Sequence, residues 1–217
     1  ATIEWLRVGQ LSKLIEIFKN QAVTQCVMVG QIAPKNLFTL RPDLRTVKLL
    51  ATLSSKNAHS IFGAIADELA KEGITLIKAT PWLQSAMPKA GFCLGPSPSK
   101  NQLTDMEFGH DIAKEISRLE IGLTVIVKNG TVLAVEGFEG TDDCLKRGGQ
   151  LAGKDGGAVA VKVAKAHHDL RFDIPCLGRR TLETCASAGI SAIAFETGST
   201  LLLDPEDVKF LADRQNI

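Results

Sequence analysis

The sequence predicts an α/β protein with two domains, because helical and strand-like segments alternate along it. Residues 9–20 carry apolar side chains at positions 11, 14, 15 and 18, the spacing of an amphipathic helix. The apolar run 23–32 follows it, and this order is typical of βαβ units with a parallel sheet. Farther along, Asn129-Gly130 joins two apolar runs and predicts a β-hairpin. We therefore expect a partial Rossmann-like parallel sheet in the N-terminal domain and a mixed sheet in the C-terminal domain.

The first half of the chain predicts four further elements. Pro42 opens a helix that runs to about Thr52, and a longer helix covers residues 58–72 before Gly73, a common residue after a helix end. Residues 74–79 form a short strand and residues 82–87 a short helix. The sequence opens with what resembles a strand end and a helix entry, so we expect an upstream portion of the first domain to precede it.

A stretch rich in glycine, proline and serine, residues 91–100, is the best candidate for a domain boundary. We place the domains at 1–95 and 96–217. A helix over 104–118 then begins at Thr104, with Glu107 completing a capping box. The remaining prediction is two hairpin strands, helix 142–151, strand 158–164, helix 180–188, strands 191–196 and 200–203, and helix 205–213.

Composition excludes several classes of protein. Among 217 residues, 25 basic and 24 acidic side chains leave a net charge of +1, and tyrosine is absent, so we expect no nucleic-acid binding. Five cysteines without a CxxC spacing disfavour a disulfide framework or a zinc knuckle and favour a reducing cytosol, with the thiols as small core residues. No apolar run reaches about 18 residues, the length of a membrane-spanning helix.

Charged residues gather in a first cluster directly after the hairpin, from Glu136 to Asp143. Gly140 permits close approach of backbone to a ligand, and Thr141 and Asp142 are good helix N-caps. One interpretation is purely structural, in which Asp142 caps a helix and Glu136 faces solvent. The other is functional, because Glu139 lies beside a helix start whose free N–H groups bind anions.

A second cluster follows the predicted strand 158–164. Lys162 and Lys165 flank the strand end, and Asp169, Arg171 and Asp173 alternate after it, so on extended backbone the last three share one face. One interpretation of this pattern is a ladder of ion pairs with a purely structural role. The functional alternative is a metal and phosphate site, because arginine forks onto phosphate and carboxylates ligate Mg²⁺. His167 and His168 lack evident partners for zinc, and 153–157 is interpreted as a turn.

Together, the segments EGTD (139–142) and DLRFDIP (169–175) resemble the LpxI-type UDP-2,3-diacylglucosamine pyrophosphatases. The similarity covers nearly the whole chain and is densest from about residue 120 to 204. The chain departs from the family pattern at several positions, among them Leu123, Asn57 and His168. These departures concern the substrate details and the activity that the resemblance implies, and the fold assignment does not depend on them.

The resemblance implies a cytosolic enzyme of lipid A synthesis at the inner membrane surface of a Gram-negative-type bacterium. It would hydrolyse UDP-2,3-diacylglucosamine to UMP and 2,3-diacylglucosamine 1-phosphate by water attack on the α-phosphorus, with Mg²⁺, as a homodimer that exchanges domains. The residues implied are catalytic Asp173, Asp142 and Arg171; substrate-binding Gly140, Thr141, Lys162, Lys165 and Asp169; and, for the metal, Asp173, Glu139 and Asp142. Two other hypotheses remain: a non-catalytic binder of nucleotide-lipids, and a dimer module whose charges pair only across subunits.

Overall fold

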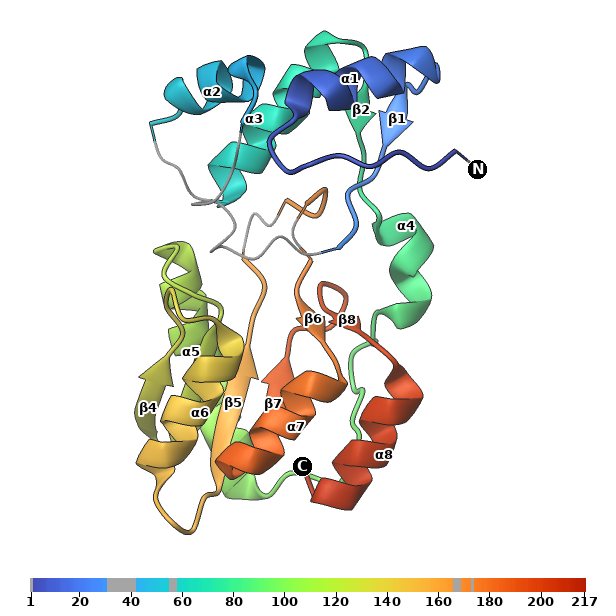
Figure 1. The fold of residues 1–217 in the computed structure, drawn as a ribbon. Coiled ribbons are helices and arrows are strands. Elements are labelled where there is room, and N and C mark those ends of the chain that lie inside the picture. The colour runs from blue at the N-terminus through green and yellow to red at the C-terminus, as the bar shows by residue number, and fades with distance from the viewer. Residues whose placement is uncertain (1, 31–41, 55–57, 166–168, 173) are drawn as a thin grey trace. The chain divides into compact units, whose positions relative to one another are not determined.

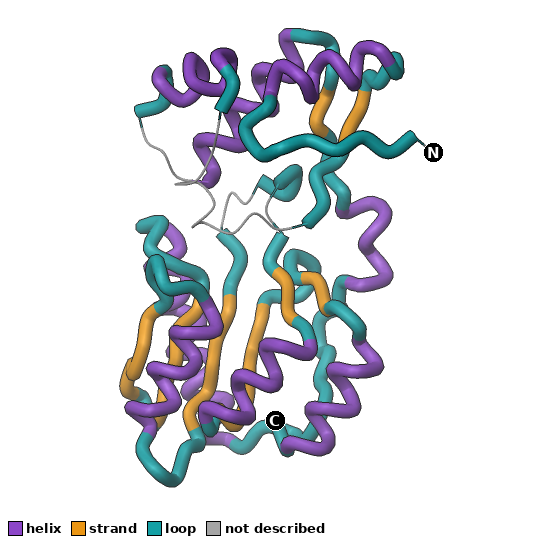
Figure 2. The backbone as a smooth tube through the Cα atoms, viewed as in Figure 1, coloured by secondary structure: helices purple, strands orange, loops and turns teal. Residues whose placement is uncertain are grey.

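The computed structural model describes residues 2–30, 42–54, 58–165, 169–172 and 174–217. The chain forms two compact units, one of Ala1–Pro81 with Asp169–Asp173 and one of Trp82–His168 with Ile174–Ile217 (Figure 1). The division after Pro81 lies upstream of the predicted boundary at 95/96. Both units contain helices and strands (Figure 2), which confirms the predicted α/β class.

The first unit is a small α/β unit built around a parallel strand pair. Strands β1 (Gln25–Cys26) and β2 (Thr75–Leu76) pair in parallel, as the alternating sequence pattern predicts, although both are shorter than expected. Its helices are α1 (Leu11–Asn20), α2 (Leu44–Ala51) and α3 (Ala58–Lys71). The apolar stripe of α1 places Leu11 and Ile15 in a buried cluster with Leu69 and Ile74, so this stripe attaches α1 to the unit.

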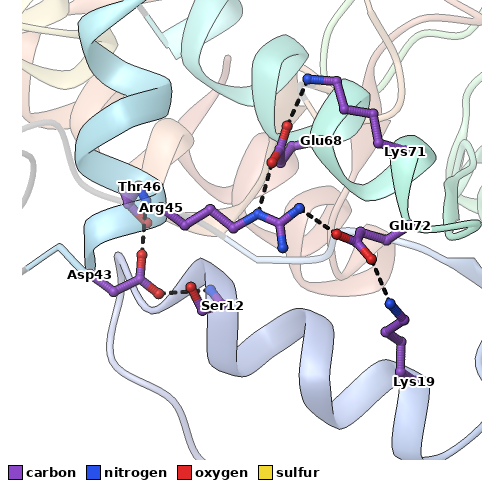
Figure 3. Close-up of polar contacts among 8 residues, drawn as sticks. All are labelled: Ser12, Lys19, Asp43, Arg45, Thr46, Glu68, Lys71 and Glu72. Carbon is purple, nitrogen blue, oxygen red and sulfur yellow. Dashed lines mark hydrogen bonds and ion pairs between the residues drawn. The ribbon is translucent and has the colours of Figure 1, made fainter.

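A charged network ties the three helices of the first unit together (Figure 3). Arg45 of α2 bonds Glu68 at 2.8 Å and Glu72 at 2.5 Å, and Lys19 of α1 bonds Glu72 at 2.6 Å. The hydrogen bond from Lys19, followed in size by the one from Arg45, lowers the pKa of Glu72 to about 2. Because its partners come from α1 and α2, Glu72 is ionised wherever this packing is intact.

The second unit contains a four-stranded mixed sheet of order β4-β3-β5-β7. Its strands are β3 (Thr124–Lys128), β4 (Thr131–Val135), β5 (Ala158–Lys162) and β7 (Ile190–Phe195). Strand β3 is antiparallel to β4 and to β5, whereas β5 and β7 are parallel. The β3–β4 hairpin turns at Asn129 and Gly130, which both have positive φ, so this prediction is confirmed.

The sheet lies between helices on both faces. Helix α5 (Lys100–Arg118) covers one face, and α6 (Thr141–Ala152) and α7 (Arg179–Ala188) cover the other (Figure 1). Alternate strand residues build two cores: Val125 and Val161 pack toward α5, whereas Ile126 packs toward α6. Gly148 permits the close approach of α6, because a Cβ there would lie 2.7 Å from Ile126.

The remaining elements of the second unit flank this sheet. Strands β6 (Cys176–Leu177) and β8 (Leu201–Leu202) form a separate parallel pair, which packs with α7 and α8 (Pro205–Gln215) in a third apolar cluster. Helix α4 (Thr80–Leu83) and the 3₁₀ helix η2 (Gln84–Ala86) carry the chain from the first unit to the second.

The predicted start of α5 was wrong by four residues. The helix begins at Lys100, and Ser99 is the N-cap, with Gln102 completing the capping box. Thr104 lies inside the helix, where its hydroxyl donates to the carbonyl of Lys100 at 3.1 Å. Both segments fit the capping-box pattern, and at the earlier one Gln102 also donates to Ser191 at 3.0 Å.

The expectation that the cysteines fill the core holds only in part. Cys144 and Cys185 are buried, and burial raises the pKa of each thiol to about 12. Cys93 and Cys176 are exposed, because they lie in a loop and in the short strand β6. Within the described ranges, none of the helices has the length and apolar character that a membrane crossing requires.

Candidate active site

Polar side chains gather at one edge of the four-stranded sheet. Strands β4, β5 and β7 end at this edge, and β3 begins there, because β3 is antiparallel to both of its neighbours. We call this the polar edge and define it by Glu136, Thr141, Lys162 and Glu196. Polar side chains at the carboxyl ends of strands are a common setting for ligand sites in α/β folds.

The centre of the polar edge is a chain of hydrogen bonds among buried groups. The Nζ of Lys162, the last residue of β5, donates to the Thr141 hydroxyl at 2.8 Å, and that hydroxyl donates to Glu136 at 2.8 Å. Glu136 is 9% exposed and Lys162 is 8% exposed, so both side chains have left bulk water. Buried charges are stable only when paired, and the Thr141 hydroxyl links them.

The burial of Glu136 corrects the interpretation that it faces solvent. Its other carboxylate oxygen accepts from the backbone N–H of Leu123 at 3.3 Å, which fixes it against the start of β3. The neighbouring Thr124 is fully buried, and its hydroxyl has no hydrogen-bond partner among the residues that the structure describes. Sequence reasoning missed this role because Glu136 becomes buried only when α6 packs over the sheet.

The start of α6 presents backbone N–H groups beside Lys162. Gly140 is the N-cap with φ of 83°, a conformation that favours glycine, and Thr141 is the first helical residue. The prediction that Thr141 or Asp142 caps this helix was therefore wrong, since neither side chain bonds the first turn. Free N–H groups, the helix dipole and a lysine together suit an anionic group such as phosphate.

The two acidic side chains of the EGTD segment are each paired with arginine. Asp142 bonds Arg180 at 2.7 Å, and Arg180 is 85% exposed. Glu139 forms an ion pair with Arg147, which also donates to the carbonyl of Val135 at 2.8 Å. The Arg147 hydrogen bond lowers the pKa of Glu139, so this carboxylate is ionised at neutral pH.

A second charged group at the polar edge was not found from the sequence. Glu196 follows β7 and bonds Lys114 of α5 at 2.8 Å and His110 at 3.3 Å, and it accepts from the N–H of Ala164 at 2.7 Å. Burial favours the protonated form, but the hydrogen bonds from Lys114 and Ala164 outweigh it and lower the pKa of Glu196. Helix α5 and the end of β7 are far apart in sequence, so only the packed fold reveals this pair.

Lys165 lies three residues beyond β5 and faces Glu120, whose Oε1 is 3.6 Å from its Nζ. This pair belongs to the second unit, as does the polar edge. Of the predicted lysines, Lys162 is therefore the one that joins the buried chain of hydrogen bonds.

Asp169 and Arg171 belong to the first unit, and their predicted geometry was wrong. Residues 170–172 form a turn rather than extended backbone, with the N–H of Phe172 donating to the carbonyl of Asp169 at 3.2 Å. Arg171 forks onto Asp169 through Nε at 2.9 Å and Nη2 at 2.6 Å, which raises the pKa of the guanidinium. The ring of Phe172 lies 5.7 Å from that of Phe62 on α3. The simpler interpretation, an ion pair, is confirmed for these two residues.

The predicted metal ligands are carboxylates, which suit a hard cation such as Mg²⁺. The parts of the chain that the structure describes contain no group of three histidine, cysteine or acidic side chains placed to hold a metal. Asp173, His167 and His168 lie outside the described residues. Asp142, one of the predicted ligands, is paired with the exposed Arg180.

Comparison with models of known protein families shows which family this chain belongs to. The model of the LpxI N-terminal domain matches residues 1–86, and that of the LpxI C-terminal domain matches residues 89–217. The chain belongs to the LpxI family. It is 30% identical over 215 residues to a Caulobacter vibrioides protein named UDP-2,3-diacylglucosamine pyrophosphatase LpxI, a match that covers 95% of this chain and 77% of that protein. The recognition made from the EGTD and DLRFDIP segments is thereby confirmed.

Proposed function

We propose that this LpxI-family protein is a UDP-2,3-diacylglucosamine pyrophosphatase of lipid A synthesis. The observation that carries the proposal is the match of both LpxI domains along the chain, together with a relative named for this activity. The polar edge adds a chemical reason, because its lysine, threonine hydroxyl and helix N–H groups suit a phosphate ester.

In the proposed reaction, water attacks the α-phosphorus of the UDP group. The bond from that phosphorus to the bridging oxygen breaks, which gives UMP and 2,3-diacylglucosamine 1-phosphate. Lys162 and the N–H groups at the start of α6 bind the phosphoryl oxygens and stabilise the charge that develops on them. Glu136 holds the Thr141 hydroxyl and so keeps Lys162 oriented before substrate arrives.

The remaining predicted residues complete this proposal. Asp173, with Asp142 or Glu139, would hold Mg²⁺, which when bound polarises the phosphoryl group and lowers the pKa of water. Arg171 would neutralise charge on the diphosphate after exchanging Asp169 for a phosphate oxygen. Lys165, Gly140 and Asp169 would line the path of the substrate. The protein would act in the cytoplasm at the inner membrane surface and as a homodimer.

One assay tests this function directly. The protein is incubated with UDP-2,3-diacylglucosamine, and UMP is measured with Mg²⁺ and with a chelator. We expect UMP in amounts equal to 2,3-diacylglucosamine 1-phosphate, and only with Mg²⁺. Tight binding of substrate without any turnover would instead identify a non-catalytic nucleotide-lipid binder.

A further inference from the structure

The backbone just beyond strand β5 is buried at a point where its neighbour β7 has ended. Strand β7 ends at Phe195, which is paired with Lys162 at the end of β5, and residues 197–199 form a turn. Ala164 is nevertheless only 3% exposed. A buried backbone N–H or C=O is costly unless it is hydrogen-bonded, so both polar groups of Ala164 require partners.

Two side chains from distant parts of the sequence supply these partners. Glu196 Oε2 accepts from the backbone N–H of Ala164 at 2.7 Å, and Lys114 Nζ donates to the carbonyl of Ala164 at 3.1 Å. Lys114 Nζ also donates to Glu196 Oε1 at 2.8 Å, so the two side chains hold each other in place. We call this arrangement the β5 clamp and define it by Lys114, Ala164 and Glu196.

The β5 clamp also holds Lys162 through the main chain. The backbone N–H of Glu196 donates to the carbonyl of Lys162 at 3.3 Å. On the β3 side, the N–H of Val163 donates to the carbonyl of Leu123 at 2.9 Å. Lys162 is the last residue of β5, and the ends of an element open more readily than its middle. Bonds on both sides of this strand end therefore keep the Lys162 side chain directed at Thr141.

The β5 clamp and Thr141 approach the strand from opposite faces of the sheet. Lys114 belongs to α5, which covers one face, whereas Thr141 begins α6, which covers the other. The clamp therefore acts on Lys162 through the backbone of β5. Lys114 and Glu196 are 35% and 25% exposed, and each uses its charge for its partner and a hydrogen bond for the backbone.

We propose that Glu196 and Lys114 are positioning residues for the reaction, which hold the end of β5 so that Lys162 meets a phosphoryl oxygen in the productive orientation. The inference rests on the proposed function for the identity of that phosphoryl group. Its own basis is the pair of side-chain bonds to the buried backbone of Ala164. A displacement of about 1 Å at a reacting group can cost roughly 100-fold in rate, so the loss of such bonds has a measurable effect.

Lys114→Met keeps the length of the side chain and removes both of its hydrogen bonds. We expect kcat for UMP release to fall about 10-fold and KM to change less, because an oriented lysine acts mainly in the transition state. Lys114→Arg keeps a cationic donor and should recover most of the lost rate. Arg118→Met is the matched control on α5, because Arg118 and its partner Glu115 are 66% and 64% exposed. An original kcat in folded Lys114→Met would overturn the inference.

A double-mutant cycle tests whether the β5 clamp acts through Lys162. In Lys162→Met protein the ammonium group to be oriented is gone, so adding Lys114→Met should lower kcat/KM by less than about two-fold further. If the pair only stabilised the protein in general, the two losses would multiply. Circular dichroism and thermal unfolding establish that each variant is folded. Multiplied losses in a folded double variant would contradict the proposal.

Exchanging the two charges distinguishes a backbone clamp from a simple ion pair. Lys114→Glu combined with Glu196→Lys keeps opposite charges, but the glutamate cannot donate to the Ala164 carbonyl and the lysine cannot accept from its N–H. We therefore expect kcat to stay about 10-fold below the original. Recovery of the original kcat would show that only the ion pair matters and would refute the clamp. If this double variant does not fold, the cycle with Lys162 decides alone.

Substrate binding separates this inference from the proposed function. If UMP is released and the losses multiply, the positioning role fails alone. If none of the proteins releases UMP, the enzymatic proposal fails, and calorimetric titration with UDP-2,3-diacylglucosamine takes the place of the assay. The clamp then stands if Lys114→Met weakens binding in the original protein but not in Lys162→Met protein. Equal weakening in both, or no binding by the original protein, would reject it.

Discussion

Lys162 carries a charge in a buried setting, since the residue is 8% exposed at the end of the buried strand β5. Its hydrogen bond to Thr141, and through it the contact with Glu136, keeps this charge in place before any ligand binds. A phosphate oxygen would give the ammonium a second, charged partner, and such bonds are roughly twice as strong as neutral ones. Lys162 is thus the group of the polar edge that would bind an anion.

Lys162→Met keeps the length of the side chain and removes its charge. We expect kcat/KM for UMP release to fall about 10- to 100-fold, because a hydrogen bond to a charged group contributes about 1.5–3 kcal/mol. Lys146→Met is the control, since Lys146 lies on the exposed side of α6 in an ion pair with Asp143. A folded Lys162→Met protein with the original kcat/KM would remove Lys162 from the site.

At the scale of elements, the sequence contains two possible N-caps for α5, Ser99 and Thr104, and the structure shows which of them begins the helix. Ser99 accepts from the N–H of Gln102 and caps the helix, whereas Thr104 only bonds backward to Lys100. Ser99→Ala is expected to lower the free energy of unfolding by about 1 kcal/mol. Thr104→Ala should leave it unchanged or slightly higher, because a threonine inside a helix gains little from its hydroxyl.

Denaturant unfolding of both variants measures this difference. A loss of stability in Thr104→Ala but not in Ser99→Ala would mean that the helix begins at the later position. The two substitutions together therefore test where the helix begins, and not merely whether α5 tolerates an alanine.

The packing of α1, α2 and α3 in the first unit depends on pH through Glu72. Its folded-state pKa of about 2 lies below the ordinary value of 4.5, so its contribution is complete above pH 4.5 and is lost as the pH falls toward 2. Glu72→Gln should therefore be less stable than the original protein at pH 7, with the difference vanishing near pH 2. Denaturation curves from pH 2 to 7 check this, with Glu16→Gln on the exposed side of α1 as the control.

A difference between Glu72→Gln and the original protein that stays constant from pH 7 to pH 2 would contradict this account. Such a result would mean that the carboxylate stabilises the unit through its shape and not its charge.

For the whole molecule, the sequence was most informative where the signals are local. The β3–β4 hairpin, most of the helices and strands, and the turn at 153–157 follow from residues adjacent in the chain, whereas the short strand β6 was not predicted. The family resemblance followed from two short segments. These local features were sufficient for the α/β class and for the family.

Features that depend on tertiary packing were not predictable from one sequence. Glu136 changes from an expected surface residue to a buried one because α6 covers it, and Glu196 meets Lys114 only when α5 packs on the sheet. The extended geometry expected for Asp169 and Arg171 failed because their direct ion pair stabilises a turn.

The central proposal is that Asp173 and Lys162 of the polar edge act on one Mg²⁺-bound diphosphate. Asp173→Ala removes the predicted essential acid while leaving Lys162 and Thr141 in place. The decisive measurement is Mg²⁺-dependent UMP release by this variant, with circular dichroism and thermal unfolding as checks of its fold. We expect a folded protein without detectable turnover. Turnover at the original rate by folded Asp173→Ala would contradict the claim.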